Sequence, residues 1–213
     1  MAEPLDTQTL GAFLDALASG APTPGGGSVA AMSGAMAAGL VSMVCAFTVG
    51  KKQFAEIEQE VRRVHERAEQ LRHELQALAA QDIEVFGRLS AAYKLPRTTE
   101  ADSATRQAAI QQVTRQAAEV PLRTAQAAAE LLPLCIALAS RVGRLIVSDI
   151  GVAAVLARAT VQSAILNVEI NLAGLEDQRY VREVRAQIED LSVGLGEETE
   201  GVLTIVRGRI NAS

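Results

Sequence analysis

The chain has 213 residues and a net charge of −5, and 49% of its residues are hydrophobic although only 3% are aromatic. This length is sufficient for one substantial hydrophobic core, and we expect residues 1–213 to form a single domain. Small apolar side chains, mainly alanine, suit closely packed helices and not a β-sheet, which favours aromatic and β-branched residues. Acidic and basic residues are interspersed without a basic stripe, so the composition argues against nucleic-acid binding.

The cysteines and histidines give little support for a metal or disulfide site. Cys45 and Cys135 lie in apolar runs and neither belongs to a CxxC motif, so we expect two buried thiols in a reducing compartment. His65 and His73 lie in one charged segment, which argues against a zinc site. Residues 1–10 lack the charged and apolar stretches of a secretory signal. We therefore expect a cytoplasmic protein with no bound metal.

One segment leaves a membrane alternative open. No charged residue occurs between Ala21 and Gly50, and residues 28–49 are long enough to span a bilayer. Small residues recur in it at helical spacing, which allows close helix packing in membranes and in soluble bundles alike. Its alanine, glycine and serine content makes transfer into lipid weak, and the segments on both sides are amphipathic. We favour a buried helix of a soluble bundle with no membrane association.

Hydrophobic spacing, capping residues and prolines predict helices over residues 6–17, 28–50, 57–95, 100–139, 148–172 and 177–205. Ser28, either Ser148 or Asp149, and Asp177 are predicted to cap helix starts. Pro121 is expected to kink the fourth segment or to start a new helix there. No segment alternates as a strand does, and the joints are short. The pattern therefore predicts an all-α, single-domain antiparallel bundle of about seven helices.

Asp82 is the most informative residue, because it occupies an inward position of an otherwise apolar stripe. The stripe comprises Ile57, Val61, Val64, Ala68, Leu71, Leu75, Leu78, Asp82, Val85, Leu89 and Ala92. A buried, unpaired carboxylate costs several kcal/mol or has a raised pKa. Either the helix end leaves the core near this position, or the carboxyl group lines an internal cleft and acts as an acid or base.

A glycine-rich segment precedes the charge-free helix and consists of Pro24, Gly25, Gly26, Gly27 and Ser28. Glycines let backbone N–H groups reach a ligand, and a helix start favours anions. The spacing matches neither a P-loop nor a dinucleotide-binding fingerprint, so a purely structural turn is the alternative interpretation.

Polar residues also occur on the two most apolar predicted helices. Lys51 and Lys52 follow the charge-free helix, where they either complement its dipole or face a cleft. The helix over residues 148–172 carries polar residues near one face, where Asp149 and Asn167 are five turns apart. These residues are Ser148, Asp149, Asn167 and Asn171. Such side chains either cap and join helices or hydrogen-bond a heterocycle with a pterin-like edge of donors and acceptors.

Four blocks of sequence occur in a recognisable order. They are residues 21–31 (APTPGGGSVAA) with 48–52 (TVGKK), 82–86 (DIEVF) with 91–96 (AAYKLP), 120–122 (VPL), and 148–153 (SDIGVA) with 167–171 (NVEIN). In these blocks the chain resembles the cyclodeaminase/cyclohydrolase family over nearly its whole length, and four ordered blocks are far more specific than one motif. Arg144, Ser163 and Gln53 depart from the family pattern. Arg144 could alter a loop beside the site or contact the folate tail.

The resemblance implies an all-helical homodimer with a folate site in a cleft near the subunit interface. It implies a 5,10-methenyltetrahydrofolate cyclohydrolase or a formiminotetrahydrofolate cyclodeaminase that acts on a tetrahydrofolate derivative without a tightly bound cofactor. The alternative is a non-catalytic helical module that binds folate or dimerises.

Both reactions pass through a tetrahedral carbon and need proton transfer, which a carboxyl group with a shifted pKa can perform. We therefore expect Asp82 to act as the catalytic acid or base, with Lys52, and Lys51 beside it, setting its ionisation or binding an anionic group. Asp149 and Asn167 are expected to orient the pterin, and the glycine-rich segment to contact the ligand through its backbone.

Overall fold

The structure, a computed structural model, describes residues 7–212. Over this range it contains eight α-helices, two short 3-10 helices and no strand. They are α1 (Leu10–Ala18), α2 (Gly26–Thr48), η1 (Lys52–Ile57), α3 (Glu58–Tyr93), α4 (Glu100–Ala129), α5 (Leu131–Ala139), η2 (Arg144–Ile146), α6 (Val147–Leu172), α7 (Gln178–Ser192) and α8 (Leu195–Asn211). The all-α prediction is confirmed, and the number of α-helices in the described residues is one more than the seven predicted.

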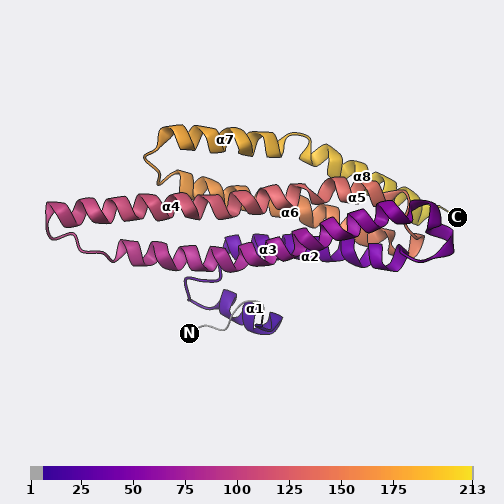
Figure 1. Cartoon of the computed structure of the whole chain (residues 1–213), viewed down its shortest axis with the longest axis horizontal. Helices are drawn as coiled ribbons and strands as arrows, with labels where there is room; N and C mark the ends of the chain where they lie inside the picture. The colour runs from indigo at the N-terminus through magenta and orange to yellow at the C-terminus, as the bar shows by residue number, and fades with distance from the viewer. Residues whose placement is uncertain (1–6, 213) are drawn as a thin grey trace.

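The centre of the molecule is a bundle of α2, α3, α4 and α6. Each of these helices packs against at least two of the others, and Figure 1 shows α3 and α4 running side by side along the length of the molecule. Small side chains such as Ala31, Ala38 and Ala153 are fully buried between the helices. They allow the close approach that the alanine-rich composition predicts. Cys45 and Cys135 are free, buried thiols in the same core, as predicted.

Pro121 lies inside α4, so the alternative that a new helix starts at this residue is wrong. α4 continues through it to Ala129, and a break follows at Glu130 instead. Proline lacks an N–H group, so it leaves the carbonyl group four residues earlier without its helical donor. That carbonyl belongs to Ala117, and it accepts a hydrogen bond of 2.9 Å from Asn171 Nδ2 of α6. A neighbouring helix thus supplies the donor that the proline lacks.

The last predicted helix is also divided. Gly194 has φ +72°, a left-handed conformation that glycine adopts without steric cost, and it separates α7 from α8. Sequence spacing alone treats residues 177–205 as one helix, because a single glycine inside a periodic pattern does not by itself mark a break.

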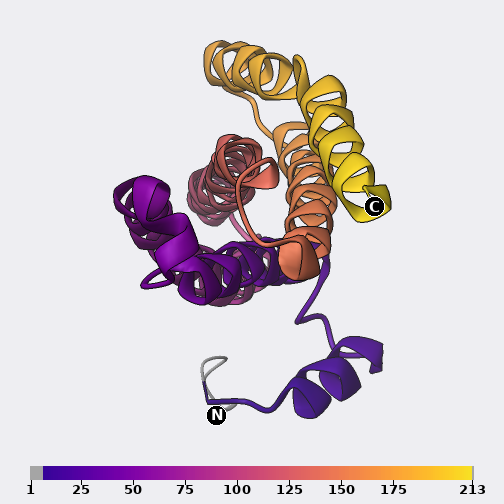
Figure 2. The same cartoon turned by 90° about the vertical axis from the view of Figure 1, so that its right-hand side faces the viewer.

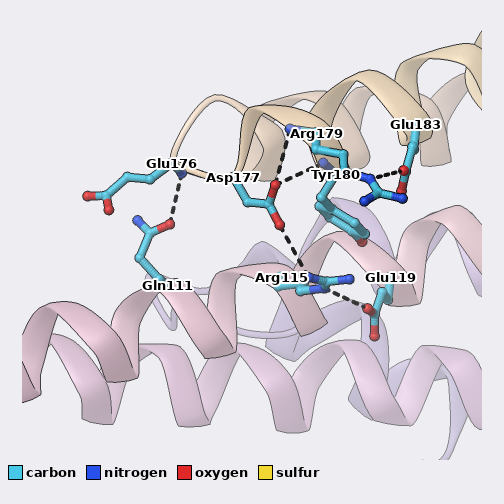
Figure 3. Close-up of polar contacts among 8 residues, drawn as sticks. All are labelled: Gln111, Arg115, Glu119, Glu176, Asp177, Arg179, Tyr180 and Glu183. Atoms are coloured by element: carbon cyan, nitrogen blue, oxygen red, sulfur yellow. Dashed lines mark hydrogen bonds and ion pairs between the residues drawn. The ribbon is translucent and has the colours of Figure 1, made fainter.

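A group of polar contacts joins the start of α7 to α4 (Figure 3). Asp177 caps α7 by accepting hydrogen bonds from the backbone N–H groups of Arg179 and Tyr180, as predicted. The same carboxylate lies 3.5 Å from Arg115 of α4, whose guanidinium group is 4.1 Å from the centroid of the Tyr180 ring. A smaller apolar cluster between α4, α6 and α7 lies beneath these contacts.

The predicted caps of α2 and α6 are wrong. α2 begins at Gly26 and α6 at Val147, and neither helix has a side-chain hydrogen bond at its N-cap. Ser28 is already inside α2, so its hydroxyl group is available for a tertiary contact. Ser148 and Asp149 likewise lie inside the first turn of α6.

The N-terminal helix α1 stands apart from the bundle in both Figure 1 and Figure 2. It begins at Leu10, where Thr9 caps it, and residue 6 of the predicted helix lies outside the described residues. The connection of residues 19–25 leads from α1 to α2.

Three helical stretches of the described residues are long and apolar enough to cross a membrane. They are Gly26–Thr48, Glu100–Ala139 and Arg144–Leu172. About half of each apolar window is buried inside the bundle, so much of this apolar surface serves packing within the chain.

Candidate functional site

The centre of the site is the carboxyl group of Asp82. Asp82 belongs to α3, and its carboxyl group lies beside the first turn of α2. Ser28 Oγ donates a hydrogen bond of 2.8 Å to Asp82 Oδ2. Gly27 allows the two helices to approach this closely, because a Cβ atom there would overlap with the carboxyl group of Asp82. The inward position predicted for Asp82 is therefore confirmed, and the neighbouring glycine has a steric function.

Partial burial raises the pKa of Asp82 above its ordinary value of 3.8. Hydrogen bonds from the hydroxyl and backbone N–H groups of Ser28 act in the opposite direction, since they favour the ionised form. Desolvation is the larger effect. A carboxyl group in this state accepts and returns protons closer to neutral pH than a solvated one does.

A cavity of about 280 Å³ adjoins this carboxyl group. Its polar side is formed by Gly25, Gly26 and Gly27 of the glycine-rich segment and by Asn167 and Asn171 of α6. The structure therefore brings residues from all four sequence blocks to one cavity. The cavity combines a few convergent polar groups with apolar walls, as small-molecule sites do.

The asparagine amides are held in place by backbone carbonyl groups. Asn167 Nδ2 donates to Ser163 O at 2.8 Å, and Asn171 Nδ2 donates to Ala117 O and to Asn167 O. The Asn171 amide thus joins α6 to α4, and the Asn167 amide bonds within α6. Their carbonyl oxygens remain as acceptors for a ligand in the cavity.

The apolar walls were not named as site residues from the sequence. Val85, Phe86 and Leu89 line the cavity from α3, and Ala117 and Val120 line it from α4. Helical spacing could have identified the residues from α3. Val85, Phe86 and Leu89 follow Asp82 by three, four and seven positions, so they lie on the same side of the helix as Asp82.

Other predicted site residues lie at the opposite end of the bundle. Lys51 and Lys52 follow the C-terminal end of α2, whose 23 residues span about 35 Å. Ser148 and Asp149 are in the first turn of α6, whereas Asn167 is near its end. Within one chain, neither lysine is placed to set the ionisation of Asp82, and Asp149 does not line the cavity. Pro24 is not among the residues that line the cavity, but its chain neighbours Thr23 and Gly25 are, and the Thr23–Pro24 peptide bond is cis.

Arg144 has a structural contact and is distant from the cavity. Its Nη2 atom donates a hydrogen bond of 2.8 Å to the backbone carbonyl of Ile210 at the end of α8. Arg144 does not line the cavity, and its contact with a folate tail stays a prediction.

Metal binding has no support from the described residues. Among residues 7–212, no three His, Cys, Asp or Glu side chains are grouped so that they could hold a metal ion. The absence of a tightly bound cofactor stays a prediction.

The sequence matches the formiminotransferase-cyclodeaminase family over residues 9–190, which is most of its length. The chain belongs to this family. The family resemblance predicted from the sequence is confirmed.

Two relatives and one solved structure place the chain within the family. A methenyltetrahydrofolate cyclohydrolase from Methylorubrum extorquens is 41% identical over 204 residues, covering 96% of this chain and 98% of that protein. A formimidoyltransferase-cyclodeaminase from Sus scrofa is 37% identical, covering 84% of this chain but 33% of that protein. The crystal structure of formiminotetrahydrofolate cyclodeaminase from Thermotoga maritima matches with a TM-score of 0.85 at 30% identity, covering 96% of this chain and 98% of that one.

Proposed function

We propose that this protein is a folate one-carbon enzyme, a methenyltetrahydrofolate cyclohydrolase that uses Asp82 as its catalytic base. The observation that carries the proposal is the half-buried Asp82 carboxyl group beside the glycine-rich start of α2. The cyclohydrolase from Methylorubrum extorquens supports the choice of reaction, because it matches this chain end to end. The much longer formimidoyltransferase-cyclodeaminase is matched over only a third of its length.

The reaction begins when a water molecule attacks the methenyl carbon of the cationic substrate. A bond forms between the water oxygen and that carbon, and Asp82 takes one proton from the water. The product of this step is a neutral tetrahedral adduct. Asp82 then returns its proton to N5 as the carbon–N5 bond breaks. The hydroxyl proton leaves to solvent, and the formyl group remains on N10.

Ser28 and Gly27 position Asp82 for this exchange. The Ser28 hydroxyl group holds one carboxylate oxygen, so the other is directed elsewhere. Asn167 and Asn171 contribute carbonyl oxygens as acceptors for the amino groups of the pterin, because their own NH₂ groups are engaged. Phe86, which is partly exposed at the cavity, offers an aromatic face for the ring.

We also propose that the protein is a soluble, cytoplasmic homodimer. The exposed sides of α2 and α6 are apolar, with Met36, Phe47, Val155 and Ile170 each more than 40% exposed. A second copy would cover this surface and remove the reason for a membrane contact.

The second candidate function is formiminotetrahydrofolate cyclodeaminase, which the structural similarity to the Thermotoga maritima enzyme favours. In that reaction N10 attacks the formimino carbon and ammonia leaves after receiving a proton. The same carboxyl group can transfer that proton.

Loss of the methenyl absorbance tests the proposal. Purified protein should accelerate the loss of the band of 5,10-methenyltetrahydrofolate over its spontaneous decay at the same pH. If it does not, ammonia release from 5-formiminotetrahydrofolate tests the deaminase. Folate binding without either turnover would leave the non-catalytic module as the correct assignment.

A further inference from the structure

The cavity beside Asp82 carries a single charge, and that charge is negative. Among the described residues that line the cavity, Asp82 is the only ionisable one. Arg88 of α3 and Arg123 of α4 line a separate groove instead, where they donate to the side chains of Gln116 and Gln81. Within the part of the chain that the structure describes, no side chain of the cavity offers a positive partner to Asp82.

Two helix ends meet at the cavity, and their backbone charges act differently. The N-terminal end of α2 is positive, and it faces the Asp82 carboxylate, which accepts hydrogen bonds from the hydroxyl and backbone N–H groups of Ser28. Asn167, Ile170 and Asn171 come from the last two turns of α6, whose C-terminal end is negative. The carboxylate offsets the positive end of α2, whereas the end of α6 adds to the negative potential.

The amide of Asn171 is held so that it presents an acceptor to the cavity. Its Nδ2 atom donates to Ala117 O at 2.9 Å and to Asn167 O at 2.7 Å. Ala117 O is available for this contact because Pro121 has no N–H group. A reversed amide would place its oxygen against two carbonyl oxygens, so the hydrogen-bond network fixes the observed orientation. The side-chain oxygen of Asn171 is the atom left for a ligand.

The other polar and aromatic side chains of the cavity also suit a cation. Asn167 uses its amide nitrogen on Ser163 O, so its side-chain oxygen is likewise left as an acceptor. The hydroxyl group of Thr23 can accept as well as donate. Phe86 is 42% exposed beside the cavity, and the face of an aromatic ring attracts cations. The apolar walls reduce screening by water, which strengthens each of these interactions.

We propose that this cavity selects tetrahydrofolates whose one-carbon group is cationic, that it discriminates against the neutral formyl forms, and that the Asp82 carboxylate binds the cationic group. The proposal rests on the proposed function for the tetrahydrofolate part of the ligand. The methenyl bridge is an amidinium cation, and so is the protonated formimino group, whereas the 5-formyl and 10-formyl groups are neutral. A formyl oxygen would face a carboxylate oxygen, with which it forms no hydrogen bond.

This selection has a consequence for both candidate reactions. Hydrolysis converts the cationic methenyl group into a neutral formyl group, so the product loses the interaction with Asp82 and is released more readily. The deaminase reaction starts from one amidinium cation and ends with another. A single cavity that recognises the cation therefore suits the substrates of both reactions.

A matched pair of ligands tests the selection. 5-Formiminotetrahydrofolate and 5-formyltetrahydrofolate differ at one position, where the first carries an NH₂⁺ group and the second an oxygen atom. Stopped-flow displacement of fluorescein-labelled 5-formyltetrahydrofolate at pH 8 gives both dissociation constants within the first turnover. We expect the formimino ligand to bind about tenfold more tightly or better, because hydrogen bonds to charged groups are the stronger ones. Equal affinities, or tighter binding of the formyl ligand, would overturn the proposal.

Asp82→Asn tests whether this carboxylate is the group that binds the cation. The variant should bind the neutral 5-formyl ligand within about threefold of the wild type, while the preference for the formimino ligand should fall to about twofold or less. Glu84→Gln is the charge control, because Glu84 is two residues away on α3 but its side chain is 70% exposed and does not line the cavity. That variant should keep the wild-type preference. An unchanged preference in Asp82→Asn would overturn the proposal.

The selection and the proposed reaction can fail separately. Preferential binding of the formimino ligand without turnover of any one-carbon form would count against the reaction alone. Turnover of 5,10-methenyltetrahydrofolate with equal affinities for the two ligands would count against the selection alone. Failure of the wild-type protein to bind either ligand would overturn both.

Discussion

At the scale of single residues, the site depends on Ser28 and Asp82, which are 54 positions apart in the sequence. They meet because Gly27 has no side chain at the point where α2 crosses α3. The carboxyl group is held half-buried, with one oxygen bound by Ser28 and the other close to Gly27. Each of these three residues therefore has a separate and testable effect.

Replacing Asp82 by Asn should reduce kcat by about 100-fold or more, because general base catalysis typically contributes 10²–10⁴-fold. Steady-state kinetics on 5,10-methenyltetrahydrofolate measure this effect. In the wild-type enzyme activity should fall as the pH decreases through the raised pKa of Asp82, since only the ionised form takes a proton. Asp190→Asn on α7 is the control. Turnover at the wild-type rate in the Asp82→Asn variant would refute the assignment.

The same substitution should raise thermal stability at neutral pH. The folded-state pKa of Asp82 lies above its ordinary value of 3.8, so the protonated carboxyl group stabilises the folded protein relative to the ionised one. This stabilisation is lost as the pH rises through the folded-state pKa. At pH 7 the ionised carboxylate therefore costs stability, and Asp82→Asn should gain on the order of 1 kcal/mol. Below pH 3.8 the gain should vanish. Thermal unfolding followed by circular dichroism at both pH values checks the sign.

Replacing Gly27 by Ala should displace the carboxyl group of Asp82, because the added methyl group has no space. We expect a loss of about 1–3 kcal/mol in the free energy of unfolding, together with most of the activity. Gly87→Ala is the matched control, since Gly87 also lies inside a helix but no atom lies within 4 Å of a Cβ atom there. That variant should be neutral or more stable than the wild type by up to about 1 kcal/mol in urea unfolding. Equal effects at the two glycines would contradict the steric argument.

At the scale of helices, spacing alone predicts elements well where an apolar stripe is long. The stripe from Ile57 to Ala92 predicts α3 to within two residues at its C-terminal end. Spacing is less informative at Pro121 and at Gly194. Pro121 stays inside α4 because a donor from another helix replaces the lost N–H group, and no local pattern carries that information.

The contact between Asn171 and Ala117 predicts a coupling between two helices. Asn171→Ala removes the donor and should cost about 1–2 kcal/mol, because the carbonyl group of Ala117 is left without a partner. Pro121→Ala restores the helical N–H group for that carbonyl. In this background Asn171→Ala should cost less, and a double-mutant cycle in urea unfolding measures the difference. Strict additivity of the two substitutions would show that the proline and the asparagine are independent.

At the scale of the whole molecule, one core joins α2, α3, α4, α5, α6 and α8, while α1 stands outside it (Figure 2). Both cysteines lie in this core, and burial raises the pKa of Cys45 and of Cys135 to about 12. The thiolate is the reactive form of cysteine, so neither should react while the core is intact.

Thiol titration reports on this core directly. In native buffer at pH 8 an aromatic disulfide reagent should label neither cysteine within minutes. In urea, both should be labelled, with the same midpoint as the loss of helical circular dichroism. Labelling of one cysteine below that midpoint would show that part of the core opens separately.

Local sequence determined the helical class, the position of most helices and the inward placement of Asp82. These follow from composition and from periods of three and four residues, which act over short stretches of chain. The glycine-rich segment and the two asparagines could also be chosen from the sequence as candidate site residues.

Tertiary structure decided which candidates share a site. The glycine-rich segment, Asp82 and Asn167 meet at one end of the bundle, whereas Lys51 and Asp149 lie at the other. The physical reason is the length and rigidity of the helices. Residues at the two ends of α2 or α6 belong to the same predicted segment of sequence but are about 30 Å apart in space. The packing of α2 against α3 and α6 determines which ends meet.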